Sequence, residues 1–178
     1  RSLNRLGNHL IWATLITALF VHAGWLHVVF NMWYLWIFGN NVEDAMTRPR
    51  YLVFYLACGM AATATQVLAA PASDVPIVGA SGAVAGVLGA YLVLYPRARV
   101  FTVIPLVVVW PVLEVPAWVL LAVWFVLQGL GGVRSYGSAE AGVAFFAHIG
   151  GFVAGMALAA VFATRERRGR PLRARRRV

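Results

Sequence analysis

Four polar side chains in an otherwise apolar sequence are of types that support nucleophilic catalysis: His27, Asn31, Ser81 and His148. A serine hydroxyl becomes a good nucleophile when a base removes its proton, and a histidine can do this near neutral pH. His27 and Asn31 are four residues apart in HVVFN, so on a helix they share one face and can donate hydrogen bonds to an oxyanion. Gly79 precedes Ser81 in GASG and leaves backbone N–H groups accessible at a helix start, where the helix dipole favours developing negative charge. These residues predict acyl transfer by a Ser81–His148 pair.

Taken singly, each of these side chains has an ordinary structural explanation, because polar residues in membrane helices often hydrogen-bond to a neighbouring helix. No glutamate follows His27 in an HExxH arrangement, which argues against a zinc site. His22 lies five positions before His27, on a different helix face, and we interpret it as a residue at the membrane surface rather than a haem ligand. The expected spans carry no acidic residue in their outer half, so the sequence predicts a Ser–His dyad without a third member.

The composition indicates an integral membrane protein. Of the 178 residues, 61% are hydrophobic and 12% are charged, whereas a soluble domain carries about 25% charged residues. The mean hydropathy is +0.76. The net charge of +9 comes entirely from arginine, and eight of the arginines lie in the C-terminal segment 164–178. Because this segment directly follows a hydrophobic one, we expect a basic cytoplasmic tail that attracts anionic lipid, not a nucleic-acid-binding tail.

A membrane-spanning helix needs about 20 mostly apolar residues. The sequence predicts an all-α fold, in which residues 1–163 form one polytopic transmembrane helical bundle with five spans, at about 22–39, 51–70, 77–95, 115–132 and 142–163. Residues 9–20 are apolar but too short to span, and are expected to form an interfacial or loop segment. The stretch 101–113 contains two prolines, so it is expected to be interfacial or a bent approach to the next span, with a break at Glu114.

The arginines predict the orientation of this bundle. With five spans, the arginine-rich loops and the tail all lie on one side, which is then cytoplasmic. The first, third and fifth spans enter from the outer side, with His27, Asn31, Ser81 and His148 near their starts. At 1.5 Å per residue, each side chain lies on the order of 10 Å or less below its helix start. The sequence therefore predicts that these side chains converge near the outer face.

Small residues would let the spans that carry Ser81 and His148 approach closely. The two spans carry matching stripes: Gly82 and Gly86 in one, and Ala147, Gly151 and Gly155 in the other. Such stripes bring helix backbones together. Close approach is needed because both side chains are short and their polar atoms must meet at about 3 Å.

Three stretches of the chain resemble the signature motifs of the rhomboid family of intramembrane serine proteases, in family order: HAGWLHVVFNMWYLWIFG, GASGAVAGVLGAY and AHIGGFVAGM. The stretches YPRARV and EVPAWVLLAVWFVLQ also resemble bacterial members, which implies a multi-pass protein of a bacterial cell membrane. The resemblance implies that Ser81 is the nucleophile and His148 the base, and that Gly79, His27 and Asn31 line the oxyanion site. It further implies cleavage of transmembrane protein substrates near the outer membrane surface, with no metal or nucleotide cofactor.

The chain departs from the family pattern at three places. The family core has six helices, and the first is expected upstream of Arg1. The Trp-Arg pair that is usual in the first loop falls at Ala13 and Thr14. Ala85 occupies a position where family members often carry an aromatic ring that packs on the catalytic histidine.

Two other functions are compatible with a small polytopic bundle. A catalytically inactive rhomboid-like protein that binds membrane clients would lack the serine or the histidine, and both are present here. A transporter or a haem-binding bundle would need acidic or paired polar residues along a path through the membrane, and Glu114, near the end of a span, is the one acid that qualifies.

Overall fold

A computed structural model describes residues 14, 16–71, 76–104, 110–135 and 144–164 of the chain. Residues 165–178 of the predicted tail and the start of the fifth predicted span lie outside these residues. The described chain is mostly helical, and its elements follow in the order η1 (Ala18–Phe20), α2 (Trp25–Tyr34), η2 (Leu35–Gly39), α3 (Asn40–Ala45), α4 (Arg48–Ala69), α5 (Ser81–Leu94), β1 (Arg99–Val103), β2 (Val112–Pro116), α6 (Ala117–Ser135) and α7 (Phe145–Phe162).

The first predicted span, 22–39, is part of a longer helical run. The helices α2 and α3 are joined by η2, a stretch of π-helix, so that helical structure continues from Trp25 to Ala45. Met46 ends this run, because its backbone is extended, with φ −119° and ψ −179°. The helix α4 begins two residues later and has a proline in its first turn. A proline is tolerated there because its missing N–H would have no partner within the helix.

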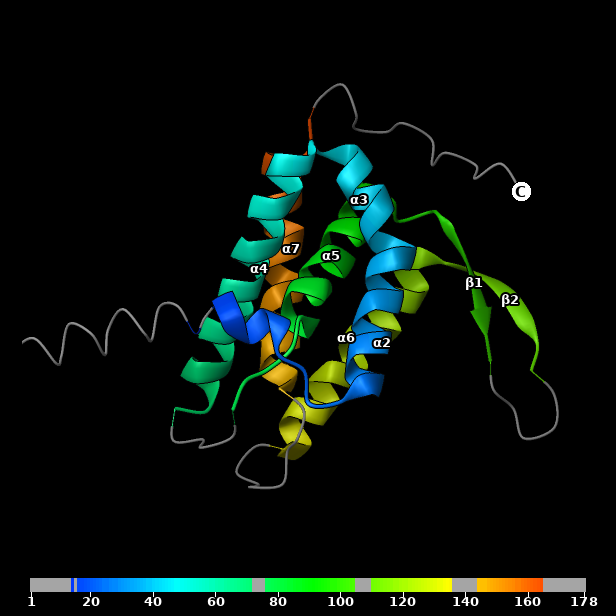
Figure 1. Cartoon of the computed structure of the whole chain (residues 1–178). Coiled ribbons are helices and arrows are strands. Elements are labelled where there is room, and N and C mark those ends of the chain that lie inside the picture. Colours follow the sequence, from blue (N-terminus) through cyan, green and yellow to red (C-terminus); the bar gives the residue numbers. More distant parts are fainter. Residues whose placement is uncertain (1–13, 15, 72–75, 105–109, 136–143, 165–178) are drawn as a thin grey trace, which may run out of the picture.

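The helix α5 lies in the middle of the bundle, between α4 and α7 on one side and α2 and α6 on the other (Figure 1). Every residue from Gly82 to Tyr91 is buried. The predicted third span, 77–95, begins earlier than this helix does. Gly79 has a φ of +108°, a left-handed conformation that cannot belong to an α-helix, so Ser81 is the first helical residue.

The predicted pairing of small-residue stripes is confirmed. A Cβ added to Gly151 would collide with the carbonyl oxygen of Gly82, and one added to Gly155 with the carbonyl oxygen of Gly86. The backbones of α5 and α7 are therefore in direct contact, which only glycine permits at these positions.

The expectation of an all-α fold is wrong in one place. Within the segment 101–113, read as interfacial or bent, the described residues belong to an antiparallel hairpin of β1 and β2, in which Val100 pairs with Val115 and Phe101 with Glu114. The physical reason is the sequence of β-branched residues, in which half-buried Val100 and Thr102 alternate with exposed neighbours. Glu114 is thus a strand residue, and its carboxylate lies 3.9 Å from the Arg99 guanidinium.

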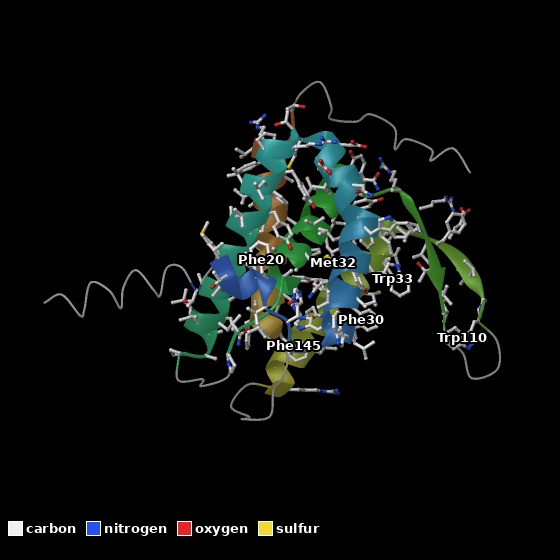
Figure 2. The ribbon with its side chains drawn as sticks, viewed as in Figure 1. Phe20, Phe30, Met32, Trp33, Trp110 and Phe145 are labelled. Carbon is white, nitrogen blue, oxygen red and sulfur yellow. The ribbon has the colours of Figure 1, made fainter. Side chains whose placement is uncertain are left out.

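By length and composition, three described helices could cross a membrane: α4, α6 from Ala117 to Arg134, and α7. The central α5 is apolar but shorter. Large hydrophobic side chains cover the outside of the described molecule, and Figure 2 labels Phe20, Phe30, Trp33 and Trp110 among them. Each of these four is at least half exposed, which suits contact with lipid and not with water.

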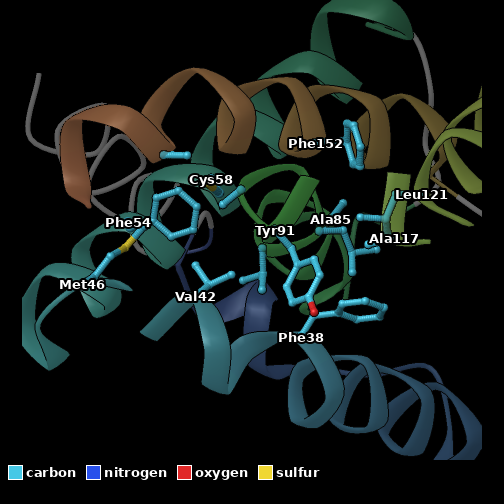
Figure 3. Close-up of a cluster of buried hydrophobic side chains, with 14 residues drawn as sticks. Phe38, Val42, Met46, Phe54, Cys58, Ala85, Tyr91, Ala117, Leu121 and Phe152 are labelled. Carbon is cyan, nitrogen blue, oxygen red and sulfur yellow. The ribbon is translucent and has the colours of Figure 1, made fainter. Parts of the chain in front are cut away.

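One cluster of buried apolar side chains forms the core around α5 (Figure 3). Phe38 of η2 meets Tyr91 edge to face, with ring centroids 5.0 Å apart. Phe152 of α7 and Leu121 of α6 belong to the same cluster. The segment 9–20 is described only in part, where Leu19 of η1 is buried against Gly59 of α4. These contacts hold the helical run 25–45, α4, α6 and α7 in fixed positions around the middle and the end of α5.

Candidate active site

Ser81 and His148 meet where α5 and α7 begin. The Ser81 Oγ lies 2.9 Å from the His148 Nε2, a hydrogen bond between two part-buried side chains that are 67 residues apart in sequence. The glycine contacts described above make this distance possible, because Gly82 directly follows Ser81 on α5 and Gly151 lies three residues after His148 on α7. The serine thus lies at a helix N-terminus, with its hydroxyl directed at an imidazole nitrogen.

A hydrogen bond connects the first turn of α7 to α4. The backbone N–H of Ala147 donates to Gln66 Oε1 at 3.1 Å, and the N–H of His148 donates to the carbonyl of Ala144 at 3.2 Å. Helix N-termini leave backbone donors without intrahelical acceptors, and Gln66 satisfies one of them here. The backbone that carries His148 is therefore fixed independently of Ser81.

Two residues of α6 complete the surroundings of the His148 ring. Gln128 Oε1 lies 2.7 Å from His148 Nδ1. The Trp124 ring lies against the imidazole, with ring centroids 6.0 Å apart and the planes at 38°. From the sequence, no third member was expected, and Ala85 stands where family members often carry an aromatic ring. In the structure, a glutamine is bonded to the histidine and the aromatic contact comes from a different helix.

His27 lies against the turn that precedes Ser81. A Cβ on Gly79 would approach the His27 imidazole to 2.5 Å, so the absence of a side chain at Gly79 allows this contact. The N–H of Gly79 donates to the carbonyl of Ala18 at 2.9 Å and is therefore already used. Gly79 shapes the site through its left-handed backbone and its missing Cβ, while the donors at this end of α5 belong to the residues after it.

Asn31 lies one turn after His27 on α2 and is 5% exposed. Its side-chain Nδ2 has no hydrogen-bond partner within the described part of the chain. Buried donors are normally paired, so this unpaired amide is an exception among the buried polar groups that the structure describes.

His22 lies closer to His27 than the sequence suggested. The ring centroids are 5.1 Å apart in an edge-to-face arrangement, and the Nε2 of His22 is buried. The helical offset that separated the two residues does not apply, because α2 begins only at Trp25. Among the residues that the structure describes, no three His, Cys, Asp or Glu side chains are grouped so that they could hold a metal ion.

Sequence reasoning missed Gln66, Trp124 and Gln128. A signal existed for two of them, because Trp124 and Gln128 are four residues apart and share one face of α6. Nothing in the spacing, however, indicates that this face turns toward His148.

Comparison with known proteins identifies a family for this chain. A family described as Rhomboid domain matches residues 9–165. The rhomboid protease GluP of Bacillus subtilis (strain 168) is 38% identical over 81 residues, which are 46% of this chain and 15% of that protein. The putative rhomboid protease YdcA of the same organism is 35% identical over 81 residues, 46% of this chain and 40% of that protein.

A longer match is to rhomboid protein 1, mitochondrial, of Saccharomyces cerevisiae (strain ATCC 204508 / S288c), which is 29% identical over 147 residues. This match covers 80% of the chain and 40% of that protein. The chain thus spans less than half the length of these relatives. No solved structure matches it.

Proposed function

Because the chain belongs to the rhomboid family, whose members are typically intramembrane serine proteases, we propose that it is a serine endopeptidase that cleaves transmembrane protein substrates. The observation that carries the proposal is the hydrogen bond of 2.9 Å between Ser81 Oγ and His148 Nε2. A hydroxyl and an imidazole at this distance form the nucleophile and base of an acyl transfer.

In the proposed reaction, His148 Nε2 takes the hydroxyl proton while Ser81 Oγ attacks the carbonyl carbon of the substrate. The resulting tetrahedral intermediate collapses when the same proton passes to the leaving amine, and an acyl-enzyme remains. A water molecule, deprotonated in turn by His148, attacks the ester and releases the second product. The two side chains suffice for the proton transfers of this cycle.

The oxyanion of the intermediate needs donors placed in advance. Asn31 supports this role because its Nδ2 is buried and unpaired in the described structure. His27 supports it because its Nδ1 faces the N–H of Ala23 at 3.5 Å, which leaves its Nε2 to carry a proton. Backbone N–H groups in the first turn of α5 add to these donors, since a helix start lacks intrahelical partners for them.

We place the active site near the outer surface of a bacterial cell membrane, which five helical spans cross. Arg48, Arg97 and Arg99 lie at the end of the bundle opposite to Ser81, where Arg50 also donates to the carbonyl of Val161 at 3.3 Å. The positive-inside rule makes that end cytoplasmic, with the basic tail 164–178 on the same side near anionic lipid. A substrate helix must unwind locally, because its own hydrogen bonds shield its peptide bonds.

Labelling of the purified protein by a fluorophosphonate probe in detergent tests the proposal, because only an activated serine reacts. We expect labelling of the wild type and none of Ser81→Ala. His148→Ala is expected to react at least about 100-fold more slowly, the usual contribution of a general base. Cleavage of a transmembrane substrate in proteoliposomes is expected to follow the same order.

Equal labelling of the wild type and Ser81→Ala would overturn the assignment of the nucleophile. A folded wild type that is not labelled would favour the alternative function, a protein of this family that binds membrane clients without cleaving them.

A further inference from the structure

Gln128 lies on the face of α6 that meets α7 beside the active site. Its side chain is half-buried, and its Oε1 lies 2.7 Å from His148 Nδ1. Trp124, one turn earlier on the same face, contacts the imidazole ring. The ring of His148 is thus bounded by Ser81 at one nitrogen, by Gln128 at the other and by an indole beside it.

The bond to Gln128 determines which nitrogen of His148 carries the proton. An amide oxygen can only accept a hydrogen bond, so Nδ1 of the neutral imidazole must be the donor. Nε2 then holds the lone pair, and it faces the Ser81 hydroxyl at 2.9 Å. In the opposite tautomer, Nε2 would direct a hydrogen at Ser81 and could not take up the serine proton.

We propose that Gln128 is a positioning residue, which holds His148 in the tautomer and orientation that let it act as the base for Ser81. The inference rests on the proposed function, and it extends the predicted dyad to a chain of three side chains from α5, α7 and α6. Gln128 acts through the histidine in this chain and does not contact the reacting atoms.

An uncharged acceptor suits this place in the bundle. The acidic residues that the structure describes, Glu43, Asp44 and Glu114, all lie toward the arginine-rich end, where Glu43 is 3.4 Å from Arg48. A carboxylate among apolar helices is strongly disfavoured, whereas an amide offers the same acceptor geometry without a charge. Gln128 therefore orients the histidine as an acidic third residue does in a soluble serine protease.

Three substitutions test this role. Gln128→Leu removes the acceptor at nearly constant size. Gln128→Glu restores an acceptor oxygen at the same position, because a carboxyl group in these apolar surroundings is expected to stay protonated and to accept through its carbonyl oxygen. Gln66→Leu is the matched control, because Gln66 bonds the backbone N–H of Ala147, next to His148, and not the imidazole. A merely structural role would affect the two glutamines alike.

The first readout is the tautomer of His148, measured by nitrogen NMR on histidine-labelled protein in detergent, with the signal assigned from His148→Ala. We expect the proton on Nδ1 in the wild type, in Gln128→Glu and in Gln66→Leu. In Gln128→Leu, we expect a large fraction with the proton on Nε2. The second readout is the rate of fluorophosphonate labelling, which we expect to fall about 100-fold in Gln128→Leu and to recover in Gln128→Glu.

An unchanged tautomer in folded Gln128→Leu would overturn the inference, and so would a changed tautomer with an unchanged labelling rate. If Gln128→Leu does not fold, the wild type alone tests the inference. A proton on Nε2 of its His148 would contradict the proposed hydrogen bond from Nδ1 to Gln128. If the wild type itself is not labelled, the proposed function fails, while the NMR measurement still decides whether Gln128 sets the tautomer.

Discussion

Asn31 contrasts at the residue scale with Thr63, the other polar side chain that is almost fully buried in the described part of the chain. Buried Thr63 donates its hydroxyl to the carbonyl of Gly59 at 3.1 Å, as a polar side chain inside a helix bundle normally does. Asn31 is equally buried, yet its Nδ2 has no partner in the part of the chain that the structure describes. An unsatisfied buried donor destabilises a protein by about 1–3 kcal/mol. In the proposed reaction, the oxyanion would satisfy this donor.

Asn31→Leu is therefore expected to separate stability from activity. Replacing an unpaired polar group by an apolar one of similar shape should leave the free energy of unfolding unchanged or raise it by about 1 kcal/mol. The same change should lower kcat for a transmembrane substrate by about 100- to 1000-fold, because an oxyanion donor is lost. Thermal unfolding in detergent and a cleavage assay measure the two effects.

Thr63→Val serves as the control for this substitution, because its hydroxyl bonds within α4 and lies outside the proposed machinery. It should retain full cleavage. A destabilised Asn31→Leu variant with normal cleavage would instead show that Asn31 has a structural role.

At the scale of elements, periodicity and length located every long helix but not all of their ends. The predicted span 51–70 corresponds to Arg48–Ala69, whereas the predicted start at residue 77 differs from the observed start at Ser81. Hydropathy cannot distinguish the apolar residues before Ser81 from the helix, and only the left-handed φ of Gly79 does so. The hairpin was missed for a related reason, since a short apolar run does not reveal its period.

The contact between α5 and α7 predicts a contrast between two glycines. Gly155→Ala should destabilise the protein by about 1–3 kcal/mol, because its Cβ would collide with the Gly86 carbonyl and push α7 away from α5. The rate of fluorophosphonate labelling should also fall, because the separation of the two helices moves His148 away from Ser81. Thermal unfolding and labelling rates on the same preparations measure both effects.

The matched control is Gly129→Ala on α6, where an added Cβ meets nothing within 4 Å. It should be neutral or stabilise the helix by about 0.5–1 kcal/mol. Equal behaviour of the two variants would contradict the backbone-to-backbone packing of α5 and α7.

At the scale of the whole molecule, residue types and spacing predicted the meeting of Ser81 and His148 and the pairing of their helices. They did not predict the contribution of α6. Trp124 and Gln128 share a helix face, but the choice of neighbour for that face depends on how the whole bundle packs. The glutamine also carries no charge, so nothing in the charge pattern distinguishes it from a residue that faces lipid.

The uneven distribution of charge predicts how the bundle is oriented in the membrane. Gly24, at the start of α2, lies at the Ser81 end, and a side chain there would meet nothing within 4 Å. Arg97 is exposed at the opposite end. In intact cells, a membrane-impermeant maleimide should modify Gly24→Cys, and in inverted vesicles it should modify Arg97→Cys. The native Cys58 is fully buried, so the unchanged protein should not react and serves as the control. Modification of Arg97→Cys from outside the cell would place Ser81 toward the cytoplasm and would contradict cleavage near the outer surface.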